Sequence, residues 1–152
     1  MFRGVTHLTL DAKGRMSVPS RYRERLAAHC DGQIVITVDP TPDRLLLVYP
    51  LPEWEVIEQR LVALPSLNPR ARRLQRLLMG HAAEVQVDGN GRIALPPPLR
   101  SFAGLEKKVV MIGQGNKFEL WDEHSWTARC NQWLEEVDAD DNLTDGLESI
   151  SL

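Results

Sequence analysis

Long apolar runs are absent from this sequence. Although 43% of its 152 residues are hydrophobic, no stretch approaches the roughly 18 consecutive apolar residues that a helix needs to cross a bilayer. The apolar segment of a secretory signal peptide is also missing after the first residue. We therefore expect a cytoplasmic protein that makes no contact with a membrane.

Cysteine and histidine are few and scattered. Cys30 and Cys130 are the two cysteines, and because they form no CxxC pair we expect reduced, structural thiols. The four histidines lack metal-ligand spacing, and we interpret His7, on an alternating stretch, as structural. Gly113 and Gly115 belong to a turn that lacks the third glycine of a dinucleotide-binding loop, and no P-loop or nucleophile motif is present. We expect no metal, no cofactor, no catalytic residue and no enzyme activity.

Basic residues are missing from the last part of the chain. All 18 Lys and Arg precede residue 130, and 14 of the 21 acidic residues lie within 1–134, so this part carries a net charge of +4. Residues 135–152 carry −7, which the overall value of −3 hides. A basic body with an acidic tail is typical of nucleic-acid contact, and solvated charge without a partner is the alternative. The acidic residues of the tail are Glu135, Glu136, Asp138, Asp140, Asp141, Asp145 and Glu148.

A nine-residue motif occurs twice. Asp11-Ala-Lys-Gly-Arg15-Met-Ser-Val-Pro19 returns 77 positions later as Asp88-Gly-Asn-Gly-Arg92-Ile-Ala-Leu-Pro96. The Asp, Gly, Arg and Pro are identical in the two copies, and Arg23 and Arg100 follow at the same offset. Internal similarity at a fixed spacing indicates a duplicated structural unit.

The segments around the two motifs also correspond. An alternating stretch, typical of a half-buried strand, precedes each motif, and the proline of each motif is expected to begin a short helix. A strand, a turn, a second strand and an amphipathic helix follow in both copies. The order predicts a β-rich α+β fold, with a first repeat at 1–66, a linking basic helix at 67–80, a second repeat at 81–137 and an acidic tail at 138–152.

The linking helix is crowded with arginine. Asn68 can cap its start, and Pro69 suits its first turn. These side chains can bind phosphates or pair with acidic groups on a neighbouring subunit, and we favour the second interpretation. The four arginines are Arg70, Arg72, Arg73 and Arg76.

Each motif has the residue types of a tight turn that presents an arginine. The glycines, Gly14 and Gly91, permit φ > 0. The aspartates, Asp11 and Asp88, can accept hydrogen bonds from backbone N–H groups two residues on. The arginine of each motif then emerges at the base of the loop, where its fork of donors suits phosphate and guanine edges.

The first copy of the motif has the more basic surroundings. Lys13 adds a cation to its loop, and Arg21, Arg23 and Arg25 follow within ten residues. We therefore expect residues 13–25 to form the most basic surface of the chain. The alternative is that the Asp and Arg of each motif only pair with each other and hold the turn together.

These features carry a resemblance to known families. Two copies of strand, Asp-x-x-Gly-Arg, strand and Pro-led helix resemble the SpoVT/AbrB-type domain. Met1-Phe-Arg-Gly, His7, Asp11-Ala-Lys-Gly-Arg15 and Pro19, together with Asp88-Gly-Asn-Gly-Arg92-Ile and Leu95-Pro96, resemble the MraZ family. The resemblance covers residues 1 to about 137.

The resemblance implies both a fold and a function. It implies two swapped-hairpin units that form a pseudo-dimeric small β-barrel with flanking helices, and subunits assembled into rings of about eight or twelve. It also implies a nucleoid-associated transcriptional regulator, often a repressor, that binds direct repeats in double-stranded DNA upstream of the division and cell-wall gene cluster beginning with its own gene. We assign DNA contact to Arg3, Lys13, Gly14, Arg15, Arg21 and Arg23, and a structural role to Asp11, Asp88, Gly91 and Arg92.

Three other classes of protein are alternatives. No motif favours an enzyme. An antitoxin-type regulator shares the AbrB-like unit but usually has one copy and a toxin-binding tail, which leaves the acidic tail as its supporting feature. A purely structural ring protein would assemble in the same way without binding DNA.

Overall fold

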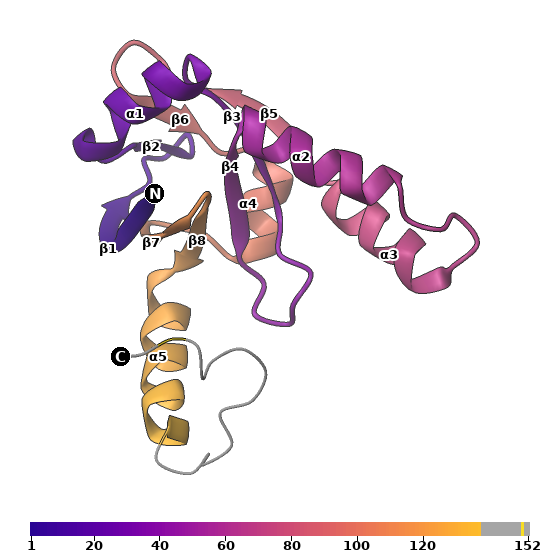
Figure 1. Ribbon diagram of the computed structural model, residues 1–152. Helices are drawn as coiled ribbons and strands as arrows, with labels where there is room; N and C mark the ends of the chain where they lie inside the picture. The colour runs from indigo at the N-terminus through magenta and orange to yellow at the C-terminus, as the bar shows by residue number, and fades with distance from the viewer. Residues whose placement is uncertain (138–149, 151–152) are drawn as a thin grey trace.

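The computed structural model describes residues 1–137 and residue 150, so nearly all of the predicted acidic tail lies outside the described residues. The described part is a small α+β fold with five helices and a mostly antiparallel sheet, as the sequence predicted (Figure 1). None of these helices is long and apolar enough to span a membrane. The elements are β1 (Phe2–Thr9), β2 (Arg15–Ser17), α1 (Ser20–Cys30), β3 (Gln33–Val38), β4 (Leu46–Pro50), α2 (Leu51–Val62), α3 (Pro69–Leu78), β5 (Ala83–Gln86), β6 (Arg92–Ala94), α4 (Pro97–Ala103), β7 (Lys108–Gly115), β8 (Phe118–Asp122) and α5 (Glu123–Val137).

The strands of the two repeats pair with one another. The main sheet has the order β1-β7-β8-β4-β3-β5, and a separate ribbon consists of β2 and β6. The first strand of each repeat pairs with a strand of the other repeat, since β1 pairs with β7 and β5 pairs with β3. The ribbon and the β4–β8 pair at the centre also join the repeats. Neither predicted repeat therefore has a complete sheet of its own.

The predicted closed barrel is not confirmed. Among the described residues, the six strands form an open sheet with β1 and β5 at its edges. The motif turns explain part of the difference, because each one leads the chain out of the main sheet and into the ribbon. The swapped-hairpin, pseudo-dimeric description of the units remains a prediction.

Two apolar cores lie on opposite faces of the main sheet. One core is covered by the ribbon, α1 and α4, and its centre is Phe118, whose ring centroid lies 4.2 Å from that of Phe2 and 4.9 Å from that of Tyr22. The other core is covered by α2, α3 and α5 and includes Trp54 and Trp121. The alternation of side chains along the strands supplies both faces.

Local turn and cap chemistry sets several helix boundaries. Asn68 caps α3, because its Oδ1 accepts hydrogen bonds from the backbone N–H groups of Arg70 and Ala71. Gly104 ends α4 with φ +61°, as expected of a glycine after a helix. The expectation that Pro19 and Pro96 are the first helical residues is wrong by one position, because both prolines are the N-cap residues.

Candidate nucleic-acid interface

The ribbon brings the arginines of both motifs to one surface. Its register pairs Arg15 with Ala94, Met16 with Ile93, and Ser17 with Arg92. The central pair is almost fully buried, at 1% exposure each. Since side chains alternate along a strand, the two arginines lie on the outer face of the ribbon, and each lies opposite a small side chain of the other strand, Ala94 or Ser17.

Each motif loop is shaped by its aspartate. In the first loop, Asp11 Oδ1 accepts hydrogen bonds from the backbone N–H groups of Lys13 and Arg15, both at 2.9 Å. In the second loop, Asp88 Oδ1 accepts from Asn90 N at 2.8 Å and from Arg92 N at 2.9 Å. The glycine before each arginine has positive φ, +78° in the first loop and +74° in the second, so the two turns have the same geometry.

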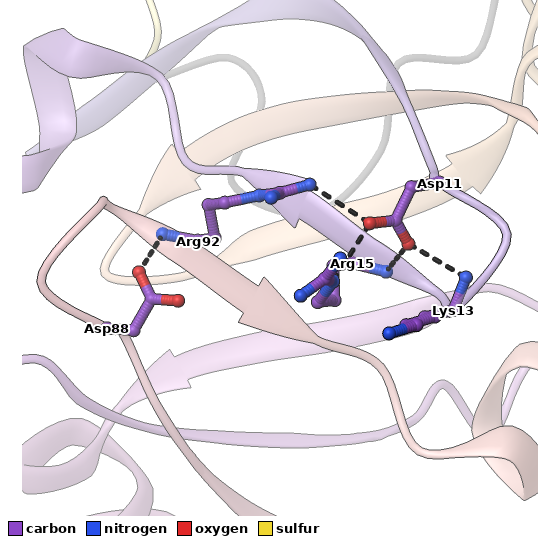
Figure 2. Close-up of polar contacts among 5 residues, drawn as sticks. All are labelled: Asp11, Lys13, Arg15, Asp88 and Arg92. Atoms are coloured by element: carbon purple, nitrogen blue, oxygen red, sulfur yellow. Dashed lines mark hydrogen bonds and ion pairs between the residues drawn. The ribbon is translucent and has the colours of Figure 1, made fainter.

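Asp11 also binds the arginine side chains of both motifs. Its Oδ2 accepts from Arg15 Nε at 2.9 Å and from Arg92 Nη2 at 3.0 Å (Figure 2). Among the described residues, no arginine side chain makes the corresponding bond to Asp88. The two loops are therefore unequal, and the first one holds the carboxylate that joins them.

The charges on these carboxylates are stabilised by the loops. The hydrogen bond from the Arg15 backbone N–H is the main cause that lowers the pKa of Asp11 to about 2, against a smaller opposing effect of burial. The Arg92 backbone N–H likewise lowers the pKa of Asp88. Both aspartates are thus anionic at neutral pH, which keeps Asp11 able to hold the two guanidinium groups.

The pair between Asp11 and Arg15 orients the arginine without using all of its donors. The Arg15 side chain is 42% exposed and the Arg92 side chain 35%. Within residues 1–137, Arg15 bonds Asp11 through Nε, and its two Nη groups make no hydrogen bond. The Asp–Arg pairing considered as the alternative is therefore present in the first loop, and it leaves the two Nη groups of Arg15 without a hydrogen-bond partner among the described residues.

The remaining basic residues near the first motif are either exposed or in contact with the edge strand β1. Lys13 and Arg3 are exposed. Arg21 Nη2 donates to Thr6 Oγ1, which ties α1 to the edge strand β1. Arg25 Nη1 reaches the carbonyl of the first residue at 2.7 Å and supports the same strand. These arginines border β1 rather than the loop itself.

Arg23 lies beside the second loop, not the first. A Cβ built on Gly91 would come within 2.6 Å of Arg23 Cδ, and Arg23 Nε donates to Val18 O at 2.7 Å. The expectation that Arg23 extends the basic flank of the first loop is therefore wrong in its placement. The equivalent arginine of the second repeat, Arg100, lies over buried Gly14 of the first loop.

The position of Arg100 beside the first loop was not predicted from the sequence. Its signal was visible, because Arg23 and Arg100 share the offset of the motif. Each arginine lies beside the loop of the other repeat because the two repeats pair with each other. In this pairing, Val18 N donates to Gly91 O at 2.8 Å and Leu95 N donates to Gly14 O at 2.9 Å. Nothing in the spacing of one repeat indicates that its helix covers the loop of the other.

The other candidate residues lie away from the ribbon. His7 Nδ1 is 3.1 Å from Glu123 Oε2, a contact between β1 and α5. Cys30 is buried and Cys130 partly buried, and both are free thiols. Among the described residues, no three histidine, cysteine or acidic side chains gather in a metal-binding arrangement. The arginines of α3 are exposed, and none of them forms an ion pair within the part of the chain that the structure describes.

Comparison with known proteins places the chain in a family. The model of a family described as "MraZ protein, putative antitoxin-like" matches residues 1–77 and again residues 78–146. A protein of Halorhodospira halophila called transcriptional regulator MraZ is 62% identical, and one of Thioalkalivibrio sulfidiphilus with the same name is 59% identical, each alignment covering 100% of both chains. A Coxiella burnetii protein of that name is 50% identical over the same full coverage. On this evidence the chain belongs to the MraZ family.

Proposed function

We propose that this chain is a sequence-specific DNA-binding transcriptional regulator. On the outer face of the β2–β6 ribbon, Asp11 holds Arg15 and Arg92 side by side, and this arrangement supports contact with DNA. The relatives named as transcriptional regulators, which match the whole chain, support the same function. A DNA-binding protein of this kind acts in the cytoplasm, associated with the nucleoid.

The ribbon has a size and chemistry suited to the major groove. A two-stranded β-ribbon fits that groove, and a guanidinium can donate two hydrogen bonds to the O6 and N7 atoms of guanine. Arg15 is oriented by Asp11 through Nε and retains its Nη donors for this contact. We assign base contact to Arg15 and assign phosphate contacts to Lys13, Arg3 and Arg21, with Gly14 acting through the shape of the loop.

Two assignments change with the observed geometry. Arg92 was expected to be structural, but its place beside Arg15 supports a second arginine at the DNA. Arg23 adjoins the second loop, where it can meet a phosphate on that side of the ribbon. Asp88 and Gly91 keep the structural role of shaping the second loop.

Assembly into rings accounts for the modest number of cations in one copy. Several copies on spaced half-sites raise affinity through effective concentration, without any new contact. Rotational symmetry also fits direct repeats better than palindromes. Exposed apolar side chains lie on α2, on α5 and in the turn between α2 and α3, which extend from the sheet (Figure 1), and they support contacts between copies. They are Val62 of α2 at 64% exposure, Leu67 of the turn at 92% and Leu134 of α5 at 66%. We propose rings of about eight or twelve, built from pseudo-dimeric units with exchanged strands and the repeat boundaries predicted above.

The proposed target is the DNA upstream of the division and cell-wall gene cluster that includes the gene for this chain, with repression as the outcome. The test is an electrophoretic shift assay with that upstream DNA and with a duplex in which the direct repeats are scrambled. We expect a shift of the first duplex at concentrations that leave the second free. Equal binding to the two duplexes would contradict sequence-specific regulation. Absence of binding to either duplex would favour the alternative of a structural ring protein.

An antitoxin-type regulator is the second candidate. The words "antitoxin-like" in the family description favour it. Two AbrB-like units in one chain argue against it, since antitoxins of this type usually have one. A stable stoichiometric complex with a toxin encoded beside this gene, found by co-expression and size-exclusion chromatography, would favour the antitoxin.

A further inference from the structure

Arg100 is a cation of the second repeat that lies against the motif loop of the first. A Cβ built on Gly14 would come within 2.7 Å of Arg100 Nη1 and 2.9 Å of its Cδ. The guanidinium therefore occupies the space left by the missing side chain of Gly14. The backbone bond from Leu95 N to Gly14 O, at 2.9 Å, holds the start of the second repeat's helix against the same loop.

The donors of Arg100 are not committed to the fold. Its Nε is closed off from solvent and has no hydrogen-bond partner among the described residues. Glu106 lines the same surface hollow, but no ion pair within 4.0 Å joins Arg100 to it or to another acidic group of residues 1–137. The equivalent Arg23 differs, since its Nε donates to a backbone carbonyl at 2.7 Å. A buried guanidinium donor that lacks a hydrogen-bond partner costs free energy. Arg100 is therefore suited to bind an external anion.

The surroundings of Arg100 are cationic. Lys13 is exposed in the loop, and the Arg15 side chain at its end is 42% exposed. The carbonyl of Lys107 accepts a hydrogen bond from the residue before the loop, at 2.7 Å, so an exposed lysine also borders the loop. The second loop has Asn90 and Gly32 at the corresponding places. The positive charge is thus concentrated at the first loop, and the second repeat supplies half of it.

We propose that Arg100 binds a phosphate of the DNA backbone together with Lys13, in a phosphodiester site that neither repeat contains alone. The inference rests on the proposed function and adds a residue to its DNA surface. A planar guanidinium matches the geometry of a phosphate. Phosphate contacts fix the register of a protein on the duplex without reading sequence, so Arg100 positions the first loop while Arg15 reaches the base edges.

The test substitutes Arg100→Met, which keeps an unbranched stem over Gly14 and removes the charge. Arg60→Met is the matched control, because Arg60 is an exposed arginine on α2, which covers the other face of the sheet. DNA affinity is measured by fluorescence anisotropy between about 50 and 200 mM salt, with the upstream DNA and with an unrelated duplex. Particle size and melting temperature are measured on the same samples.

We expect Arg100→Met to assemble normally and to weaken binding to both duplexes in the same proportion, by at least about tenfold, because the contact is lost in every protomer that meets the DNA. The slope of log affinity against log salt should fall in magnitude by about 0.9 for each protomer that contacts the DNA. Arg100→Lys should restore that slope, and Arg60→Met should leave it at the parent value.

Three results would overturn the inference. The first is an unchanged slope of log affinity against log salt in Arg100→Met. The second is a loss of that slope in Arg60→Met equal to the loss in Arg100→Met. The third is failure of both Arg100→Met and Arg100→Lys to assemble, which would make Arg100 a packing residue. Failure of the proposed function is distinguishable, because in that case the parent protein itself would not bind the upstream DNA.

Discussion

Arg92 Nη2 lies 3.0 Å from Asp11 Oδ2, although the two residues are 81 positions apart in the chain. The same oxygen accepts the Arg15 Nε at 2.9 Å. One carboxylate of the first repeat therefore sets the orientation of an arginine from each repeat. Because both arginines lie on the outer face of the ribbon, the shape of the proposed DNA surface depends on Asp11.

Asp11→Asn tests this dependence. The amide oxygen can still accept the backbone N–H groups of the loop, but the amide nitrogen faces the two guanidinium groups and cannot accept their hydrogen bonds. We expect upstream DNA binding to weaken about tenfold or more, since hydrogen bonds to charged groups are the strong ones. Asp88→Asn is the control, because Asp88 accepts no hydrogen bond from an arginine side chain among the described residues. Its effect on DNA affinity should therefore be smaller. Equal losses of affinity in anisotropy assays would contradict the role of Asp11.

Gly14→Ala and Gly91→Ala are expected to destabilise the fold. Both positions have positive φ, where a residue with a Cβ costs about 1–3 kcal/mol, and the new methyl groups would also meet Arg100 and Arg23. Gly89→Ala, in the same loop as Gly91, is the control, since a Cβ there meets nothing within 4 Å. Thermal or urea unfolding measures the three variants. A Gly14→Ala protein as stable as Gly89→Ala would contradict both the positive φ of Gly14 and its close contact with Arg100.

Acid should destabilise the protein in a defined pH range. The pKa of Asp11 is lowered from 3.8 to about 2, so the folded state favours the charged carboxylate more strongly than the unfolded state does. This contribution is complete above the unfolded pKa and is lost as the pH falls from about 4 to about 2. We expect the melting temperature to fall across that range and the fall to be smaller in Asp11→Asn, which has no carboxyl to protonate. Identical pH profiles of parent and variant would refute this source of acid sensitivity.

Those features that depend on neighbouring residues could be predicted from the sequence. The Asn68 cap, the Gly104 helix end and the Asp-x-x-Gly-Arg turns all follow from the conformational preferences of a few adjacent residues. The order of strands and helices followed from the repeat. The starts of the two helices that follow the motifs were missed by one residue, at Pro19 and Pro96.

The arrangement of the two repeats in space could not be predicted in the same way. Strand alternation says which side chains share a face, but it does not say which strands pair. For this reason Arg23 was placed with the nearer loop in sequence, whereas the pairing of β2 with β6 brings it to Gly91 and brings Arg100 to Gly14. The closed barrel came from the family resemblance alone, and the described strands form an open sheet.

Arg15→Ala tests whether the first loop contacts DNA. Upstream DNA binding, particle size and melting temperature are measured on Arg15→Ala, Lys13→Ala and Arg92→Ala. We predict that Arg15→Ala and Lys13→Ala abolish the shift while the particle keeps its size, because the loss of one contact is repeated in every protomer that meets the DNA. Arg92→Ala should cost less affinity, since the second loop has Asn90 where the first has a lysine. An Arg15→Ala protein that folds, assembles and shifts the upstream DNA like the parent would show that the first loop does not contact DNA.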